Sequence, residues 1–229
     1  MPRTAAVFFD VDFTLIHPGP RFQGEGYRAS CARLGVQVDA ARFDTAVSGA
    51  AALLESVDHL YEDALFVRYT RRIIELMGGT GPEVEVAARE IYEDWAEHRH
   101  FVLYDDVREA LVSLKARGYS LGLISNSHRP LGSFGAHFEL EGLISVTVSS
   151  AEHGFLKPHP SIFRAALDLM RIGPREAVMV GDSLPHDVVG ARQVGMRPVL
   201  IVRDGAATVA QTDVPVIRTL AELPELLES

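Results

Sequence analysis

The sequence predicts an α/β protein in which a core with a parallel sheet is interrupted by an inserted all-helical segment. Three observations support this fold class. Short apolar runs, typical of strands buried on both faces, occur at the start of the chain and again after residue 102. The later runs alternate with helical patterns, as in the crossover units of a parallel sheet. The segment 17–101 between them carries helical periodicity alone.

The first strand is expected at residues 5–9, where the apolar run AAVFF stops at the polar stretch DVDFT of residues 10–14. The run HPGP at residues 17–20 follows, and its Pro and Gly residues indicate a linker. Beyond this linker the apolar spacing changes from that of a strand to that of a helix. We therefore place the end of the first core segment at residue 16.

About four helices are expected between residues 17 and 101. Apolar side chains recur there at helical spacing in three stretches, 27–34, 65–76 and 84–95, and glycines separate them. Because the first strand belongs to the same sheet as the later ones, this block is an insertion. The predicted domains are a core of residues 1–16 and 102–229 and an inserted domain of residues 17–101.

Strands and helices alternate from residue 102 onward, beginning with a helix whose apolar face is Val107, Leu111 and Leu114. Each later strand is a short apolar run, and each helix follows one of these runs. The strands are expected at 121–124, 144–148, 177–180 and 198–202, and the helices at 161–170 and between Ser183 and about Gly195. This alternation completes a parallel sheet with helical crossovers.

Composition excludes several classes of protein. The 229 residues are 47% hydrophobic and 23% charged, which excludes bulk disorder. The net charge of −9 argues against a nucleic-acid binder, because such proteins need a positive field. No apolar run approaches the roughly 18 residues of a membrane span, so no membrane partner is expected. A single cysteine, Cys31, cannot form an internal disulfide, and we expect a reducing, cytoplasmic location.

Polar side chains gather where the predicted strands end, and parallel α/β sheets bind ligands at that edge. A lysine joins them from the loop 154–160; it is notable because only two of the 22 basic residues are lysines. The residues expected to converge are Asp10, Asp12, Ser125, Asn126, Lys157 and Asp182.

Such a set of residues suits phosphoryl transfer. Three carboxylates offset by one lysine call for a hard divalent cation, and oxygen-only ligation favours Mg²⁺. One carboxylate can attack phosphorus and form an aspartyl-phosphate. A second carboxyl group two residues later can protonate the leaving oxygen and then activate water. A hydroxyl and an ammonium group can hold the non-bridging oxygens on which charge spreads.

Four segments resemble, in order, the four motifs of the haloacid dehalogenase-like hydrolase superfamily. They are DVDFT at residues 10–14, Ser125-Asn126, Lys157 within GFLKPHP, and GDSLPHD at residues 181–187. The inserted helices resemble that family's type-one cap. The resemblance spans nearly the whole chain and implies a Rossmann-like core with a helical cap domain.

The resemblance also implies a role for each matching residue. Asp10 would be the nucleophile and a Mg²⁺ ligand, and Asp12 the general acid/base with its carbonyl on the metal. Asp182 would be a further Mg²⁺ ligand. Phosphoryl oxygens would be contacted by Thr14, Ser125 and Asn126. Lys157 would pair with the nucleophile. Asp187, farther from the reacting group, would hold the metal or Lys157. Phe13 occupies a position that is often glycine in the family.

The predicted function is that of a magnesium-dependent phosphatase, a phosphoric monoester hydrolase acting on a small phosphorylated metabolite through an aspartyl-phosphate. The expected form is a monomer or homodimer. The alternatives are a phosphomutase, a dehalogenase, or a non-catalytic switch phosphorylated on Asp10. Two interpretations also stay open for His128 and Arg129: they reach a distal acid or phosphate of the substrate, or they lie on a surface loop.

Overall fold

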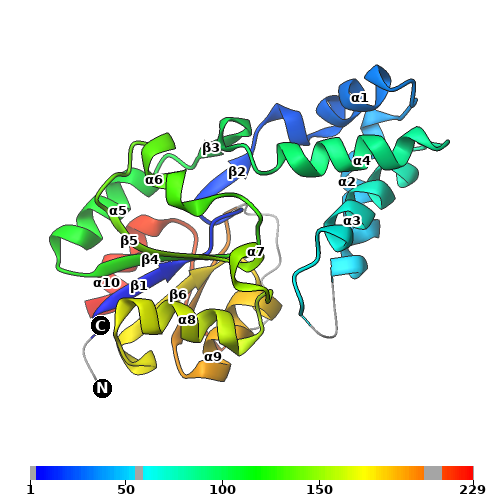
Figure 1. The fold of residues 1–229 in the computed structure, drawn as a ribbon. Coiled ribbons are helices and arrows are strands. Elements are labelled where there is room, and N and C mark those ends of the chain that lie inside the picture. Colours follow the sequence, from blue (N-terminus) through cyan, green and yellow to red (C-terminus); the bar gives the residue numbers. More distant parts are fainter. Residues whose placement is uncertain (1–3, 55–58, 204–212, 229) are drawn as a thin grey trace. The chain divides into compact units, whose positions relative to one another are not determined.

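The computed structural model describes residues 4–54, 59–203 and 213–228. The chain divides into two compact units, a core unit of Met1–His17 with Leu103–Ser229 and a cap unit of Pro18–Val102. Figure 1 shows the strands gathered in the core unit and a group of helices in the cap unit.

A parallel sheet forms the centre of the core unit, which confirms the predicted α/β class. Its order is β5-β4-β1-β6-β7-β8, and every neighbouring pair is parallel. The strands are β1 (Ala6–Phe9), β4 (Ser120–Ser125), β5 (Ile144–Ser149), β6 (Ala177–Gly181), β7 (Arg197–Ile201) and β8 (Val216–Ile217). The edge strand β8 was not predicted, because two residues are too short to form an apolar run.

Helices cover both faces of this sheet: α8 and α9 lie on one side and α5 and α10 on the other (Figure 1). Phe8, Ile124 and Met179 project from three strands into one apolar cluster, where Phe163 of α8 and Ala191 of α9 cover them. The core helices are α5 (Val107–Ala116), α6 (Phe134–His137), α7 (Ser150–His153), α8 (Pro160–Met170), α9 (Val189–Val194) and α10 (Leu223–Glu228).

The register of β1 brings the ends of three strands together. Phe9, the last residue of β1, lies beside Leu123 of β4 and Val180 of β6. The residues that follow these positions therefore emerge at one edge of the sheet. Every residue of β1 is buried and apolar, so the polar residues begin only at Asp10, directly after the strand ends.

The described part of the cap unit contains four α-helices, α1 (Gly24–Arg33), α2 (Phe43–Ala50), α3 (Asp63–Leu76) and α4 (Glu83–Asp94). Helices α3 and α4 bury one apolar face each, which explains their clear periodicity. Two short strands, β2 (Ile16–Pro18) and β3 (Phe101–Leu103), form a two-stranded sheet where the chain passes between the units. Across the described residues, no helix combines the length and apolar character needed to cross a membrane.

Candidate active site

The loop after β1 carries the first group of candidate residues. Asp10 is 7% exposed, and its backbone N–H donates to the Val180 carbonyl at 2.8 Å, which ties the strand end to β6. The chain then turns through Phe13, whose φ of +62° lies in the left-handed region that bulky residues avoid. This conformation explains why glycine suits the position. The Phe13 side chain is 45% exposed.

Lys157 is buried between two carboxylates. Its Nζ donates to Asp10 Oδ1 at 2.5 Å and to Asp187 Oδ1 at 2.7 Å, and the residue is only 2% exposed. Burial alone would lower the pKa of Lys157, but the charges of Asp10 and Asp187 raise it above its ordinary value. The lysine is therefore a fixed positive charge beside the candidate nucleophile.

Asn126 holds the backbone that presents this lysine. Its Oδ1 accepts from the Lys157 N–H at 2.7 Å, and its Nδ2 donates to the Lys157 carbonyl at 3.1 Å. Strand β4 places Asn126 directly after its last residue, so one strand end positions the loop from another part of the chain. We find Asn126 engaged with the main chain of Lys157, a contact that spacing in the sequence did not reveal.

Asp182 and Asp187 come from the end of β6 and from a π-helical turn over Leu184–Val188. Asp187 is 1% exposed, and its Oδ2 accepts from the Ser183 N–H at 3.1 Å. A Cβ on Gly181 would lie 2.2 Å from that same oxygen, so only glycine fits there. Both carboxylate oxygens of Asp187 thus have protein donors, one of them Lys157.

Three carboxylates approach closely enough to share a cation. One ligand atom from each of Asp10, Asp182 and Asp187 lies within 4.8 Å of the others. Burial raises the pKa of Asp10 well above its ordinary range; Lys157 opposes this, and Asp187 and Asp182 add to it. Burial by surrounding atoms and the charge of Asp187 also raise the pKa of Asp182, although this residue keeps access to solvent. Mutual repulsion of this kind is what a bound cation relieves.

Two hydroxyl groups complete this edge of the sheet. Thr14 is 0% exposed and Ser125 is 1% exposed. Within the described residues, neither Thr14 Oγ1 nor Ser125 Oγ has a hydrogen-bond partner. Buried polar atoms in folded proteins are nearly always paired, so two unpaired hydroxyls at one edge indicate that a ligand supplies the partner.

Arg129 is a charged site residue whose role sequence reasoning missed. It is 0% exposed, so the surface-loop interpretation is wrong for this residue. Its two terminal nitrogens donate to the two carboxylate oxygens of Asp12, at 3.2 Å and 3.0 Å. A single arginine a few residues beyond a strand end gives no pattern from which this pairing could be predicted.

The charged side chains of the site carry a net negative charge that suits a divalent cation. Four carboxylates stand against two cationic side chains, which leaves two negative charges when all are ionised. The carboxylates are Asp10, Asp12, Asp182 and Asp187, and the cations are Lys157 and Arg129. The residues present therefore fit Mg²⁺, with Asp10 and Asp182 as the side chains that would hold it.

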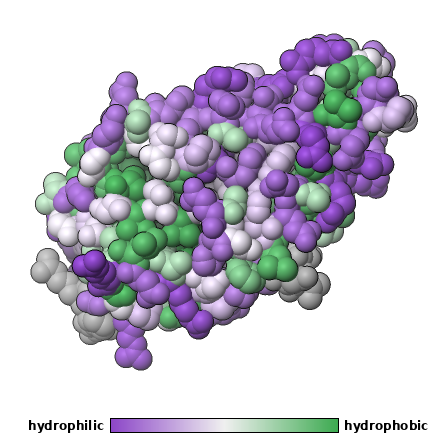
Figure 2. Space-filling view, viewed as in Figure 1, coloured by the Kyte–Doolittle hydropathy of each residue, from purple (hydrophilic) through white to green (hydrophobic). Residues whose placement is uncertain are grey.

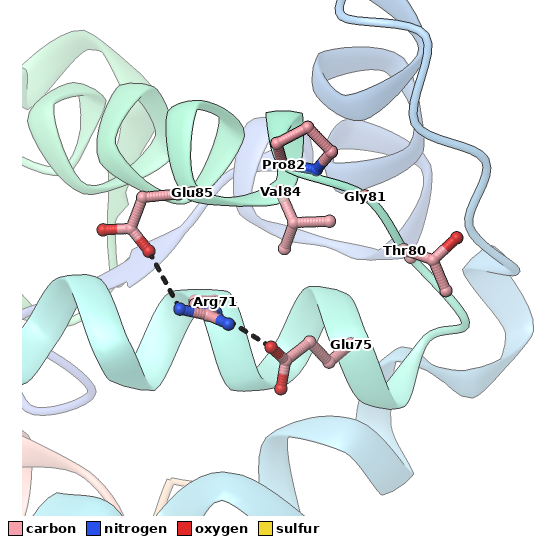
Figure 3. A pocket seen from close by; sticks show the side chains of 8 residues that line it. Arg71, Glu75, Thr80, Gly81, Pro82, Val84 and Glu85 are labelled. Carbon is pink, nitrogen blue, oxygen red and sulfur yellow. Dashed lines mark hydrogen bonds and ion pairs between the residues drawn. The ribbon is translucent and has the colours of Figure 1, made fainter.

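The cap unit has a cavity of its own, about 740 Å³ in volume, between α3, α4 and the turn of residues 79–82 (Figure 3). Arg71 lines it, and its guanidinium donates to Glu75 at 2.8 Å and to Glu85 at 3.4 Å. The cation at this cavity is thus paired with two carboxylates. The cavity contains none of the motif residues.

Comparison with known proteins agrees with the geometry of the core. A model of the family described as "haloacid dehalogenase-like hydrolase" matches residues 4–195. A protein of Pyrococcus furiosus named "Glyceraldehyde 3-phosphate phosphatase" is 30% identical over 204 residues, which are 87% of this chain and 81% of that protein. The match to "Haloacid dehalogenase-like hydrolase domain-containing protein 3" of Xenopus laevis, at 36% identity, covers 52% of this chain and about half (48%) of that relative.

Two solved structures are similar over almost the whole chain. A HAD phosphatase from Thermococcus onnurineus has a TM-score of 0.68 at 29% identity, with 98% of each chain covered. A 2-haloacid dehalogenase from Pseudomonas syringae pv. Tomato has a TM-score of 0.66 at 28% identity, also with 98% of each chain covered. The fold is thus similar both to a phosphatase and to a dehalogenase, and the side chains of the site must separate the two chemistries.

Proposed function

Because the chain belongs to the haloacid dehalogenase-like hydrolase family, we propose that this hydrolase is a magnesium-dependent phosphatase acting on a small phosphorylated metabolite. One observation carries the proposal. Asp10 is buried against Lys157, and the buried hydroxyls of Thr14 and Ser125 have no partner among the described residues. The non-bridging oxygens of a phosphoryl group can accept from the ammonium of Lys157 and from both hydroxyls.

In the proposed reaction, a carboxylate oxygen of Asp10 attacks phosphorus and the bond between phosphorus and the leaving oxygen breaks. Asp12 gives its proton to that leaving oxygen. Asp12 then takes a proton from water, the water oxygen attacks phosphorus, and the bond to Asp10 breaks to release phosphate. Lys157 holds Asp10 in position for both steps, and its charge attracts the phosphoryl oxygens.

A bound Mg²⁺ would neutralise charge on the phosphoryl oxygens. Asp10 and Asp182 are proposed as its side-chain ligands, with the carbonyl of Asp12. Asp187 is proposed as a supporting residue, because its oxygens already accept from Lys157 and from the Ser183 N–H. Thr14 and Ser125 are proposed to donate to phosphoryl oxygens. Asn126 is proposed to contribute mainly by holding the backbone of Lys157.

Asp12 favours a phosphatase over the dehalogenase alternative. A halide leaves without a proton, whereas an alkoxide expelled from a phosphate ester is a poor leaving group without an acid. A carboxyl at residue 12 supplies that acid. A phosphomutase would use the same residues but would have to keep water from its phosphoenzyme. The cytoplasmic location remains a prediction, and so does the oligomeric state, a monomer or homodimer.

The test is a screen of purified protein against a panel of phosphorylated metabolites and 2-haloacids, with Mg²⁺ and again with excess EDTA. We expect phosphate release from at least one monoester with Mg²⁺ and its loss on chelation. Halide release with no phosphate release would assign a dehalogenase instead. Exchange of phosphoryl groups between substrates without net phosphate release would assign a mutase.

A further inference from the structure

The largest side chain that is fully buried in the described residues is charged. Arg129, on the loop after β4, is 0% exposed. Removing a guanidinium from water is strongly unfavourable unless good geometry and hydrogen bonds compensate. Here both terminal nitrogens donate to the two oxygens of Asp12 in the side-by-side geometry typical of arginine–carboxylate pairs. The pair is therefore built into the fold of the core unit.

The backbone around Arg129 is also held in place. The Arg129 N–H donates to Ser127 Oγ at 2.9 Å, and Ser127 is 3% exposed. The Ser127 carbonyl accepts from the Ala151 N–H at 3.3 Å, which ties this loop to α7. The planar guanidinium of an arginine binds two oxygens at once. On a fixed backbone it therefore restricts the orientation of its partner carboxylate more than a lysine could.

Asp12 itself has less support from elsewhere. Its side chain is 16% exposed, and within the described residues its two carboxylate oxygens accept from the guanidinium of Arg129. It lies next to Phe13, in the turn with positive φ. A carboxyl group that must meet a leaving oxygen and later a water molecule needs one defined orientation, since displacements of about 1 Å can lower rates about a hundredfold.

We propose that Arg129 is a positioning residue for Asp12, and that it acts on the reaction through the orientation of that carboxylate rather than by binding substrate. The inference rests on the proposed phosphatase function and adds to it a residue outside the four motifs. It also replaces the expectation that Arg129 reaches a distal group of the substrate, because a fully buried guanidinium committed to Asp12 is not available to one.

This role predicts a particular kinetic signature. Loss of Arg129 should lower kcat and leave KM nearly unchanged, because Asp12 transfers protons and does not hold the substrate. In the first chemical step the loss should be larger for an alkyl phosphate than for an activated aryl phosphate, whose leaving group needs little acid assistance. A residue that merely supports the fold would not distinguish between these two leaving groups.

The experiment is a double-mutant cycle on the Mg²⁺-loaded enzyme with Asp12→Asn, Arg129→Gln and the double variant, assayed on both classes of ester. We expect Arg129→Gln to lose about tenfold to a hundredfold of kcat on the alkyl ester. The double variant should be no more than about threefold slower than Asp12→Asn alone, since residues that act as one unit are not additive. Arg129→Lys should recover part of the loss.

Arg21→Gln is the matched control, because Arg21 also donates to an aspartate, Asp94, but in the cap unit. We expect its kcat to stay within about twofold of the wild type on both esters. If Arg129→Gln does not fold, Arg129→Lys takes its place in the cycle, because it keeps the charge and loses the planar group.

Multiplicative losses in the double variant, or a rise in KM with kcat unchanged, would overturn the inference while the proposed function stands. A wild type that hydrolyses no phosphate ester would instead overturn the proposed function, and this inference with it. The two failures are therefore distinguishable in one set of assays.

Discussion

The core and the cap of this hydrolase differ in whether they bury charged side chains completely. Every Asp, Lys or Arg that is buried among the described residues lies in the core unit, and all four are paired there: Asp10, Arg129, Lys157 and Asp187. In the cap unit, ion pairs such as Arg71 with Glu75 and Arg28 with Glu25 keep a third or more of each side chain exposed. The visible face of the cap helices is mostly hydrophilic (Figure 2).

This difference separates the charges of the candidate active site from charges that face solvent. Exposed ion pairs contribute about 0–1 kcal/mol, because water screens them and long side chains lose freedom. Buried charges persist only where partners or a bound ion compensate for lost hydration. The contrast predicts large effects of substitution at the edge of the core sheet and small effects at cap ion pairs.

The largest effect is expected for Asp10→Asn. This change removes the proposed nucleophile but keeps its size, so the protein should fold while phosphate release falls by about 10⁴ or more. Steady-state assays with Mg²⁺ on the best substrate of the panel measure the loss. A variant that retains a tenth of the wild-type rate would show that Asp10 is not the nucleophile.

Lys157→Arg should be the next most severe change, with about 10²–10³ of kcat/KM lost although the charge is kept. The compact ammonium sits 2.5 Å from Asp10 and 2.7 Å from Asp187. A planar guanidinium does not fit that space in the same way. Near-normal kcat/KM in this variant would mean that the site needs only a positive charge.

Ser125→Ala should separate activity from stability. The Ser125 hydroxyl is buried without a partner among the described residues, so its removal should leave the free energy of unfolding unchanged or raise it by about 1 kcal/mol. Phosphate release should nevertheless fall about tenfold or more. Kinetic assays and urea unfolding of the same preparations measure the two effects.

Ser30→Ala is the matched change in the cap. Its hydroxyl donates to the Gly26 carbonyl at 2.8 Å, and it accepts from Arg21. We expect this variant to lose about 1 kcal/mol of stability and to keep its activity. The comparison would fail if both serine variants changed stability in the same direction and by the same amount.

The stabilisation by Mg²⁺ should grow as pH rises. Burial raises the pKa of Asp10, and that of Asp182 is raised to about 7. The stability from a carboxyl with a raised pKa is fully present below its unfolded value near 4 and is lost as pH rises through the folded value. The protein in EDTA should therefore lose stability between about pH 4 and pH 7 or above, and Mg²⁺ should restore it.

Melting temperatures with and without Mg²⁺, at about pH 6 and about pH 8, measure this effect. The difference between the two conditions cancels the opposite contribution of His100 and His153, whose pKa values burial lowers. Asp182→Asn should reduce the growth of that difference with pH. A difference that is constant with pH would contradict metal binding at these carboxylates.

Arg71→Gln in the cap should have the smallest effect. Its pairs with Glu75 and Glu85 are about half exposed on the arginine side, so the free energy of unfolding should change by no more than about 0.5 kcal/mol. Activity should stay within about twofold of the wild type. A hundredfold loss of kcat/KM would show that the cavity of Figure 3 belongs to the site of reaction.

The sheet and most of the core site could be predicted because burial constrains both. Strands buried on both faces read as apolar runs, and Asp10 and Asp182 stand where two such runs stop. The structure confirmed the fold class for that reason. Elements with few buried residues gave no such signal: β8 has two residues, and the buried residues of α2 are two alanines, Ala46 and Ala50.

Long-range pairings were out of reach of sequence spacing. Arg129 meets Asp12 across 117 residues, and Asn126 meets the Lys157 backbone across 31. Neither contact produces a periodic pattern or a motif in the sequence, because each depends on how two loops meet in the folded core. The positive φ of Phe13 had one signal, the resemblance in which this position is often glycine, because the phenylalanine itself looks like an ordinary apolar residue.

The central claim is that Asp10 carries the phosphoryl group during Mg²⁺-dependent hydrolysis. The direct measurement is acid quenching of the enzyme during turnover of an activated aryl phosphate, followed by mass spectrometry of its peptides. Asp12→Asn is used alongside the wild type, because slower hydrolysis of the intermediate should let it accumulate. We predict a phosphoryl adduct on the peptide that contains Asp10, present with Mg²⁺ and absent with EDTA or in Asp10→Asn. Full turnover with no adduct at Asp10 in either protein, or an adduct on another residue, would contradict the account.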